Sequence, residues 1–254
     1  MTPDNQTTSL QIKMNTRKAA IDEVAAPSGT CKRLCKQLAL LAMLILCGPA
    51  YSLGWIGNDL NGIPCQGNKQ GFGPYNYTDP QLQKRVYGEP LEIVERFHFT
   101  PEVEQLVKGA NGPLPTDIDY TLRAFPNHHR ALWAIIKFHL DERRKKPRRY
   151  TPAECYLQRA LVFSPNDGIV QMLFGIYLHK AGHMEAAGKY FDKALAINPD
   201  NAEAHYNYGL LLVDKEKYDE AIEHARTAYQ LGYPLPGLGS ILKEKGYEIA
   251  QEEK

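Results

Sequence analysis

The sequence has almost no net charge and few of the residues that mark metal or redox sites. Its 254 residues include 30 Lys and Arg against 29 Asp and Glu, a formal net charge of +1. This balance gives no general attraction to nucleic acid or to an anionic membrane, so we expect no nucleic-acid partner. The 5 cysteines form no CxxC pair, and none stands beside a histidine at zinc-ligand spacing.

Motifs for catalysis are missing as well. The sequence has no GxSxG, no phosphate-binding P-loop and no GxGxxG. Of its 8 histidines, only His179 and His183 have the i, i+4 spacing of a helical metal pair, and Gly182 interrupts them. Asp117 suits the first turn of a helix, where a carboxylate favours the helix dipole. We therefore predict no enzyme, no catalytic residue, no metal ligand and no cofactor; a metal-binding or enzymatic accessory protein of the cell envelope is the alternative.

Long uncharged runs are also absent, with one exception near the start. Residues 37–58 carry no charge, with an apolar centre at 38–47 followed by the helix-breaking pair Gly48-Pro49. Basic residues stand just upstream, and Ala50 and Ser52 are small. This pattern predicts a leader over 1–52 with a signal peptide that is cleaved after Ser52. The alternative is an uncleaved membrane tether through 38–56, and both interpretations place the rest of the chain outside the cytoplasm.

Cleavage after Ser52 would leave two cysteines, Cys65 and Cys155. In an oxidising compartment they could form a disulfide. The alternative is that Cys155 is a small buried apolar residue in a helix. The sequence leaves this choice open because it gives no distance between the two sulfurs.

The most regular feature present is a repeat with an offset of 34 residues. Residues 168–201 align with 202–235, so that Gly175 falls on Gly209 and Ala187 on Ala221. Such small residues allow two antiparallel helices to approach closely, and Pro199 ends the second helix. One helix pair cannot cover its own apolar face, so the copies are expected to stack.

This pattern resembles the tetratricopeptide repeat, which has the same period and the same placing of Leu-Gly, Ala, Phe, Ala and Pro. Phe191 and Pro199 match the family's Phe and Pro, whereas the second copy has Ala225 and Tyr233 at these positions. A divergent third copy is predicted at about 127–167, ending in Pro165. It has five extra residues around the basic run "RRKKPRR" at 143–149, which we interpret as a solvated turn.

The predicted fold is therefore all-α, a short helical solenoid of about three repeats with flanking helices. Residues 53–90, rich in Gly, Pro, Asn and Tyr, predict an irregular arm that is either flexible or laid across the helical domain at 91–254. A helix is predicted at 100–109, with Thr100 as its cap and Gly109 at its end. A capping helix is predicted at 236–246.

The resemblance implies a binding surface, because in this family the first helix of each repeat lines a concave groove. The positions that match the family's groove residues are Arg130, Trp133, Lys137, Met172, Ile176, His179, Tyr206, Asn207 and Leu210. Trp133 and Tyr206 are the predicted aromatic anchors. The expected occupant is a peptide segment or helix of another protein, or else the chain's own arm. A third interpretation is that flanking helices bury these residues.

A more specific resemblance rests on "RFHFTPEVEQLV" and "DYTLRAFPNHHRAL". These stretches resemble exported tetratricopeptide-bearing proteins of Gram-negative bacteria that have no established role. The resemblance implies a periplasmic location and supplies no activity. The expected function is an exported scaffold or assembly factor for protein–protein interaction.

The adjacent histidines in "FPNHHRALWA" fit the repeat rather than a metal site. Pro126 aligns with Pro199, so His128 and His129 fall where Asn201 and Ala202 stand, at the start of the next helix. Neighbours on a helix point in different directions and are poorly placed to share one metal ion. We predict a joint between repeats here.

Overall fold

The computed structural model describes residues 54–144 and 150–249. The predicted leader and most of the basic run lie outside these described residues. The chain divides by its contacts into two units, 1–50 and 51–254, and every described residue belongs to the second. In the described part of the chain, no helix is both long and apolar enough to cross a membrane.

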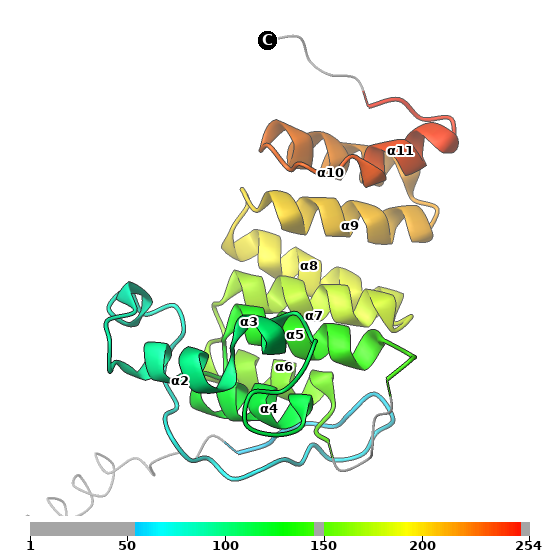
Figure 1. The fold of residues 1–254 in the computed structure, drawn as a ribbon. Helices are drawn as coiled ribbons and strands as arrows, with labels where there is room; N and C mark the ends of the chain where they lie inside the picture. The colour runs from blue at the N-terminus through cyan, green and yellow to red at the C-terminus, as the bar shows by residue number, and fades with distance from the viewer. Residues whose placement is uncertain (1–53, 145–149, 250–254) are drawn as a thin grey trace, which may run out of the picture. The chain divides into compact units, whose positions relative to one another are not determined.

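The second unit is built from helices. Within the described residues, 54–144 and 150–249, the only β pairing is an isolated bridge between Asn58 and Pro64. The later helices, from yellow-green to red in Figure 1, stack in chain order. Their bounds are η1 Leu82–Lys84, α2 Pro90–His98, α3 Pro101–Glu104, α4 Leu114–Ala124, α5 His129–Leu140, α6 Ala153–Phe163, α7 Gly168–Lys180, α8 Met184–Ile197, α9 Ala202–Asp214, α10 Tyr218–Gln230 and α11 Gly237–Glu244. The predicted all-α fold is confirmed.

Helices α7 and α8 form one repeat, and α9 and α10 form the next. The side chain of Asp167 caps α7 by accepting from the backbone N–H groups of Ile169 and Val170, both at 3.2 Å. Asn201 caps α9 in the same way, accepting from Ala204 at 2.9 Å. These caps satisfy N–H groups that have no partner within the helix, and they fix where each repeat begins.

Close packing inside each repeat explains its small residues. A Cβ atom added at Gly175 would lie 3.0–3.1 Å from three ring atoms of the buried Phe191. Gly209 faces Leu238 of α11, whose nearest methyl carbon would be 2.5 Å from such a Cβ. One buried cluster runs from α3 to α9, and a second joins α9, α10 and α11. The last helix therefore covers the end of the stack.

The flanking elements are shorter than the sequence pattern predicted. The helix expected at 100–109 is only α3, because Leu106 adopts a left-handed backbone conformation with φ +60°. Thr100 stands at its N-cap position, but its side chain makes no capping hydrogen bond. At the other end, α11 lies within the predicted 236–246, and Gly246 follows it with φ +88°.

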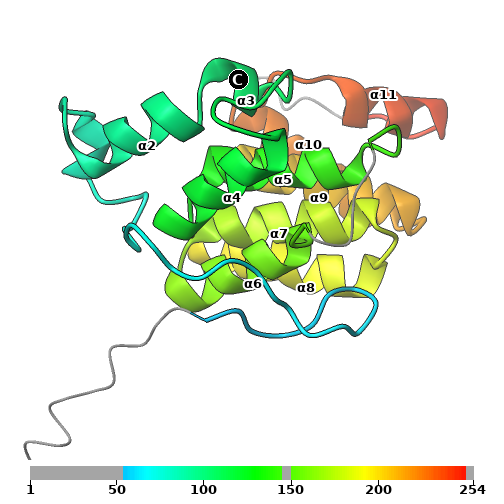
Figure 2. The same ribbon diagram turned by 60° about the horizontal axis from the view of Figure 1, so that its bottom comes forward.

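The arm is laid across the helical domain. Its backbone runs along α4 and α6, the second helices of their pairs, in both views of the ribbon (Figures 1 and 2). Hydrogen bonds fix this course: Tyr75 N–H donates to the Ala124 carbonyl at 2.8 Å, and the Thr151 hydroxyl donates to the Gln66 carbonyl at 2.9 Å.

Candidate protein-binding groove

The groove face is the set of nine residues that the family resemblance selected on α5, α7 and α9. The structure leaves Trp133 exposed, at 38 % of its surface, and leaves Arg130, Lys137, Asn207 and Leu210 half-buried. It buries the other four: Met172, Ile176, His179 and Tyr206. Met172 and Ile176 belong to the same cluster as Leu132 and Ile136 of α5, because neighbouring first helices close on one another there.

Arg130 is engaged inside the protein. It pairs with both carboxylate oxygens of Glu104, one of them at 2.7 Å, and with Glu95 at 3.1 Å. The hydrogen bond from Arg130 holds the pKa of Glu104 below its usual value, although partial burial opposes this shift. Since α3 and α2 already supply its carboxylates, Arg130 has little capacity left for a partner.

Trp133 is the largest exposed group of the groove face. The ammonium group of Lys137 lies 5.9 Å from the centre of its ring, one turn further along α5. At this distance, the positive charge is attracted to the face of the indole ring, and the attraction favours one orientation of the ring. Exposed tryptophan is uncommon on monomers and frequent at the centre of protein interfaces.

On α7 and α9, the polar groove residues have partners of their own. His179 Nε2 lies 2.7 Å from a carboxylate oxygen of Asp214, which joins α7 to the end of α9. The Asn207 amide donates to the Glu203 carbonyl at 2.8 Å, and its side-chain oxygen is the group that remains for a ligand. Tyr206 packs on Tyr233 with ring centres 4.4 Å apart, so it is an internal contact.

The two adjacent histidines lie at the joint before α5 and serve different neighbours. His128 Nδ1 accepts from the Ala131 N–H at 3.1 Å, so it is the N-cap of α5, as Asn201 is for α9. The lone pair used there requires the ring proton on Nε2, which donates to Glu95 at 3.1 Å. Burial lowers the pKa of His128, which is consistent with an Nδ1 that accepts a hydrogen bond.

His129 turns the other way, to Asp167 at 2.8 Å. Asn127 completes the joint, since its amide donates to Asp167 at 3.0 Å and its oxygen accepts from Tyr77 N–H of the arm at 2.9 Å. The hydrogen bond from His129 holds the pKa of Asp167 below its usual value against the opposing effect of burial. The joint therefore ties the arm, α5 and α7 together, and each histidine has its own carboxylate.

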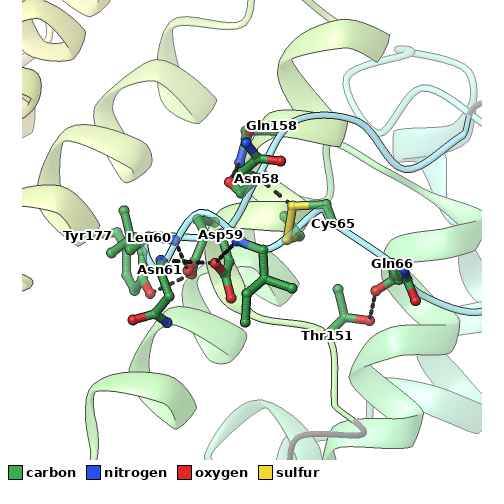
Figure 3. Close-up of a disulfide and its surroundings, with 12 residues drawn as sticks. Asn58, Asp59, Leu60, Asn61, Cys65, Gln66, Thr151, Gln158 and Tyr177 are labelled. Atoms are coloured by element: carbon green, nitrogen blue, oxygen red, sulfur yellow. Dashed lines mark hydrogen bonds between the residues drawn. A yellow bond between two sulfur atoms is a disulfide. The ribbon is translucent and has the colours of Figure 1, made fainter.

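Cys65 and Cys155, 90 positions apart in the sequence, form a disulfide with Cα atoms 5.5 Å apart (Figure 3). Around it, Leu60 N–H donates to Glu154 at 2.9 Å, and the Tyr177 hydroxyl donates to the other oxygen of Glu154 at 2.6 Å. Only 3 % of Glu154 is exposed, so these bonds satisfy a buried charge. The arm is thus fixed covalently to α6 and through Glu154 to α7.

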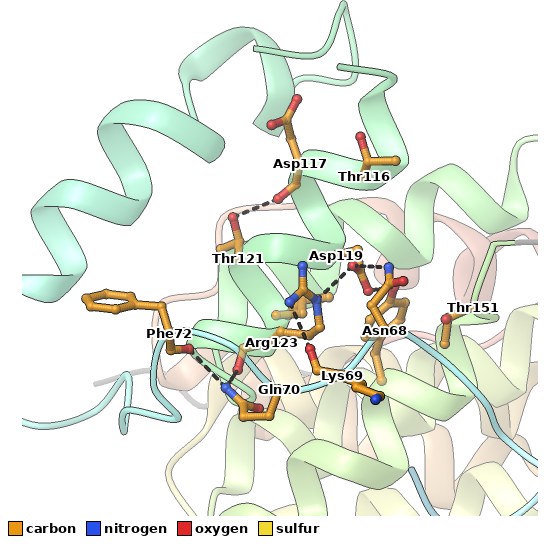
Figure 4. A network of polar contacts seen from close by, with 12 residues as sticks. Asn68, Lys69, Gln70, Phe72, Thr116, Asp117, Asp119, Thr121, Arg123 and Thr151 are labelled. Atoms are coloured by element: carbon orange, nitrogen blue, oxygen red, sulfur yellow. Dashed lines mark hydrogen bonds and ion pairs between the residues drawn. The ribbon is translucent and has the colours of Figure 1, made fainter. Parts of the chain in front are cut away.

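A second polar network fixes the arm to α4. Asp119 accepts from Asn68 of the arm at 2.8 Å, from Arg123 at 2.9 Å and from the Tyr156 hydroxyl at 2.7 Å. Figure 4 shows Asn68, Asp119 and Arg123. Burial raises the pKa of Tyr156 well above its usual value. Gln70 donates to the Arg123 carbonyl at 2.8 Å. These contacts place the arm on α4 and α6, on the side away from the groove face.

One close contact, between two histidines, is not indicated by any spacing pattern in the sequence. His205 and His224 are 19 residues apart, and their Nδ1 atoms lie 2.9 Å from each other. Burial, and then the neighbouring His205, lower the pKa of His224 to about 4. Superposing the repeats would have found the pair, because both positions lie at the interface of α9 and α10. Among residues 54–144 and 150–249, no group of three or more His, Cys, Asp or Glu side chains is arranged to hold a metal ion.

The comparison with family models identifies the repeats. Residues 172–233 match the tetratricopeptide repeat model. The match runs from within α7 to just after α10, and these residues form tetratricopeptide repeats, as the 34-residue period predicted.

The solved structures that are similar to the chain include MamA and YrrB. The crystal structure of MamA has 19% sequence identity, covers 63% of this chain and 87% of its own, and has a TM-score of 0.44. The crystal structure of YrrB, described as a tetratricopeptide-repeat protein with an unusual peptide-binding site, has 18% identity, coverage of 66% and 95%, and a TM-score of 0.34. These values are too low to transfer a partner or a site. Comparison with curated proteins gave no match.

Proposed function

We propose that the chain is an exported scaffold or assembly factor that binds a segment of another protein along its groove face. The observation that carries the proposal is Trp133, which is 38 % exposed on the first helix of a repeat. The half-buried Leu210 and Asn207 lie on α9 across the buried side chains of α7. An aromatic anchor with an apolar and a polar contact near it suits a short peptide or a helix.

The position of the arm supports an external occupant. Its hydrogen bonds and its disulfide engage α4, α6 and the joint before α5, which is the side of the second helices. The arm is therefore not available to cover Trp133. Arg130 is already paired with Glu104. Recognition of the partner would therefore depend on Trp133, Lys137 and Leu210 rather than on an ion pair between Arg130 and a carboxylate of the partner.

The proposed location outside the cytoplasm rests on the uncharged run at 37–58 and on the disulfide. Disulfides between structural cysteines persist in oxidising compartments and are rare in the cytosol. N-terminal sequencing of the native protein tests this proposal. A chain that begins at Leu53 is expected, whereas retention of 38–56 would favour the tether.

Site-specific photo-crosslinking in the native cell tests the groove. A photoreactive amino acid replaces Trp133 or Leu210 on the groove face. The matched control replaces Val162, which is 53 % exposed on α6, away from the groove face. We expect positions 133 and 210 to give the same crosslinked partner, identified by mass spectrometry, and position 162 not to give it. Identical partners from all three positions would rule out the groove as the binding surface.

A further inference from the structure

The pair His205–His224 presents two ring nitrogens to one point in space. The Nδ1 atoms are 2.9 Å apart, and the ring centres are 5.0 Å apart. His205 comes from α9 and His224 from α10, so the pair bridges the two helices of one repeat. Both side chains are half-buried.

The hydrogen bonds decide which nitrogen of His205 is free. Its Nε2 lies 2.9 Å from the carbonyl oxygen of Pro199, which can only accept. The ring proton is therefore on Nε2, and Nδ1 offers its lone pair. Histidines that bind metals usually donate their other N–H to a carbonyl or carboxylate in this manner, which fixes the tautomer and the ring orientation.

His224 is neutral and can supply the second lone pair. In the structure its Nδ1 must donate to His205, which leaves its proton-free nitrogen at Nε2. Moving that proton from Nδ1 to Nε2 turns both Nδ1 lone pairs toward the same point. The change needs no net gain or loss of protons.

Carboxylates of α8 and α10 act on His224 and oppose the effect of its burial. The Tyr208 hydroxyl donates to Asp192 of α8 at 2.9 Å, and the Tyr208 ring packs on His224 with centres 4.5 Å apart. This holds the Asp192 carboxylate near the pair. Glu220 and Glu223 of α10 also act on His224 electrostatically, although Lys217 and Arg226 pair with them.

The distance between the nitrogens is short enough for both to bind one ion. With metal–nitrogen bonds of about 2.0–2.1 Å, two ligands at a right angle lie about 2.9 Å apart, and two at the tetrahedral angle about 3.4 Å apart. Among divalent first-row metals, Cu²⁺ binds nitrogen and oxygen ligands most tightly. We propose that His205 and His224 form a two-histidine site for Cu²⁺, with water in the remaining positions.

The repeat does not itself require histidines at these two positions. In the preceding repeat, Gln171 stands in the place of His205 and Tyr190 in the place of His224. Gln171 donates to the Pro165 carbonyl at 3.2 Å, as His205 donates to Pro199. Tyr190 packs on Phe174, at 4.4 Å, as His224 packs on Tyr208. The same packing is thus made there without a metal-binding pair.

This correspondence supplies variants that the fold already accepts. The experiment titrates Cu²⁺ into the purified full chain and records calorimetry and electron paramagnetic resonance. Cys31, Cys35 and Cys47 are replaced by Ser in every sample so that no free thiol competes. We expect one Cu²⁺ per chain with nitrogen hyperfine structure. His205→Gln and His224→Tyr should each weaken binding about tenfold or more and reduce that structure from two nitrogens to one, because each leaves one ligand. Zn²⁺ should bind more weakly than Cu²⁺.

His183→Gln is the matched control, since it removes an exposed histidine from the turn before α8 and should leave binding unchanged. Circular dichroism of the metal-free variants checks that they fold. Wild-type affinity and an unchanged spectrum in folded His205→Gln or His224→Tyr would overturn the proposal. Absence of nitrogen-coordinated Cu²⁺ in the wild-type chain would overturn it as well.

Discussion

The two ends of the solenoid are held together by different kinds of interaction. In α7–α10, each repeat is a tight helix pair with a short turn, and its interior is mostly apolar. In α4–α6, the connection from Asp141 to Pro152 is long, and buried charged or polar side chains such as Asp119, Glu154 and Arg159 contact the arm. Neighbour packing stabilises the regular repeats, whereas segments distant in sequence stabilise the divergent one.

The difference follows from the insertion in the divergent repeat. Its two helices, α5 and α6, pack less extensively on each other than α7 and α8 do. The arm covers the side of α6 and α4 and adds a covalent link. The comparison can be tested by weakening each end separately.

The largest effect is expected from removing the disulfide. Replacing Cys65 and Cys155 together by Ser removes a link that closes a loop of 90 residues. The free energy of unfolding should fall by about 2–4 kcal/mol, because the unfolded chain gains conformational freedom. Denaturant unfolding of both proteins measures the change, and limited proteolysis should cut the arm of the variant first. Equal midpoints for wild type and variant would mean that the arm contributes little to the divergent end.

A pair of tyrosine variants compares a buried acceptor with an exposed one. Tyr177→Phe removes the hydroxyl that donates to the buried Glu154, and should cost about 1–3 kcal/mol. Tyr208→Phe removes the same group from the exposed Asp192, where water replaces it, and should cost less than about 1 kcal/mol. Thermal unfolding of the two variants gives the comparison. A larger loss for Tyr208→Phe would contradict the assignment of buried polar contacts to the divergent end.

Within the regular repeats, two turns differ at one position. Gly182 has φ +84°, and its counterpart in the next repeat, Glu216, has φ +58°. Because a left-handed conformation strains residues that have a Cβ atom, Glu216→Gly should stabilise the protein by about 0.5–1 kcal/mol. The reciprocal change, Gly182→Ala, should destabilise it by about 1 kcal/mol. Chemical denaturation measures both; a gain from Gly182→Ala would show that the turn does not need this conformation.

The smallest effect concerns the pH dependence of the joint. Burial lowers the pKa of His128 below the 6.5 of an unfolded chain. Between these two values the unfolded chain binds one more proton, so stability is full above about pH 6.5 and falls as the pH decreases. Its surroundings are Glu95 of α2, His129 and Arg130 of α5, and the ring of Tyr77.

His128→Asn keeps a capping side chain, as in Asn201, and removes the titrating ring. The variant is expected to lose less stability than wild type between pH 7 and pH 5, although its stability at pH 7 is lower because ring packing is lost. Thermal unfolding temperatures across this range measure the slope. Parallel curves for the two proteins would show that His128 does not carry the dependence.

The sequence predicted the regular part of the fold and less of the rest. The 34-residue period, the helix ends just before Pro126, Pro165 and Pro199, and the start of α5 after His128 all follow from local patterns in the sequence. The length of α3 did not follow, because the left-handed conformation of Leu106 comes from its surroundings. The side of the solenoid that the arm covers depends on contacts between residues 50 or more positions apart, such as Asn68 with Asp119.

The family resemblance selected the groove residues by their positions in the repeat, but it did not show which of them are free to contact a partner. Arg130 was selected, yet the carboxylate that occupies it comes from α3, outside the aligned repeats. Met172 and Tyr206 were selected, yet their neighbours bury them. Trp133 remains exposed because α5 lies at the end of the row formed by α5, α7 and α9. Of the other two helices in this row, α7 packs against α5.

The covalent link between the arm and α6 has a consequence for biogenesis. If the leader is removed after Ser52, the chain that remains contains only Cys65 and Cys155. Two thiols allow a single intramolecular pairing, so maturation requires an oxidant but no disulfide isomerase. Cys65 emerges first during synthesis and has no intramolecular partner until Cys155 follows. The arm can therefore be closed onto the helices only after α6 has been delivered to the same compartment.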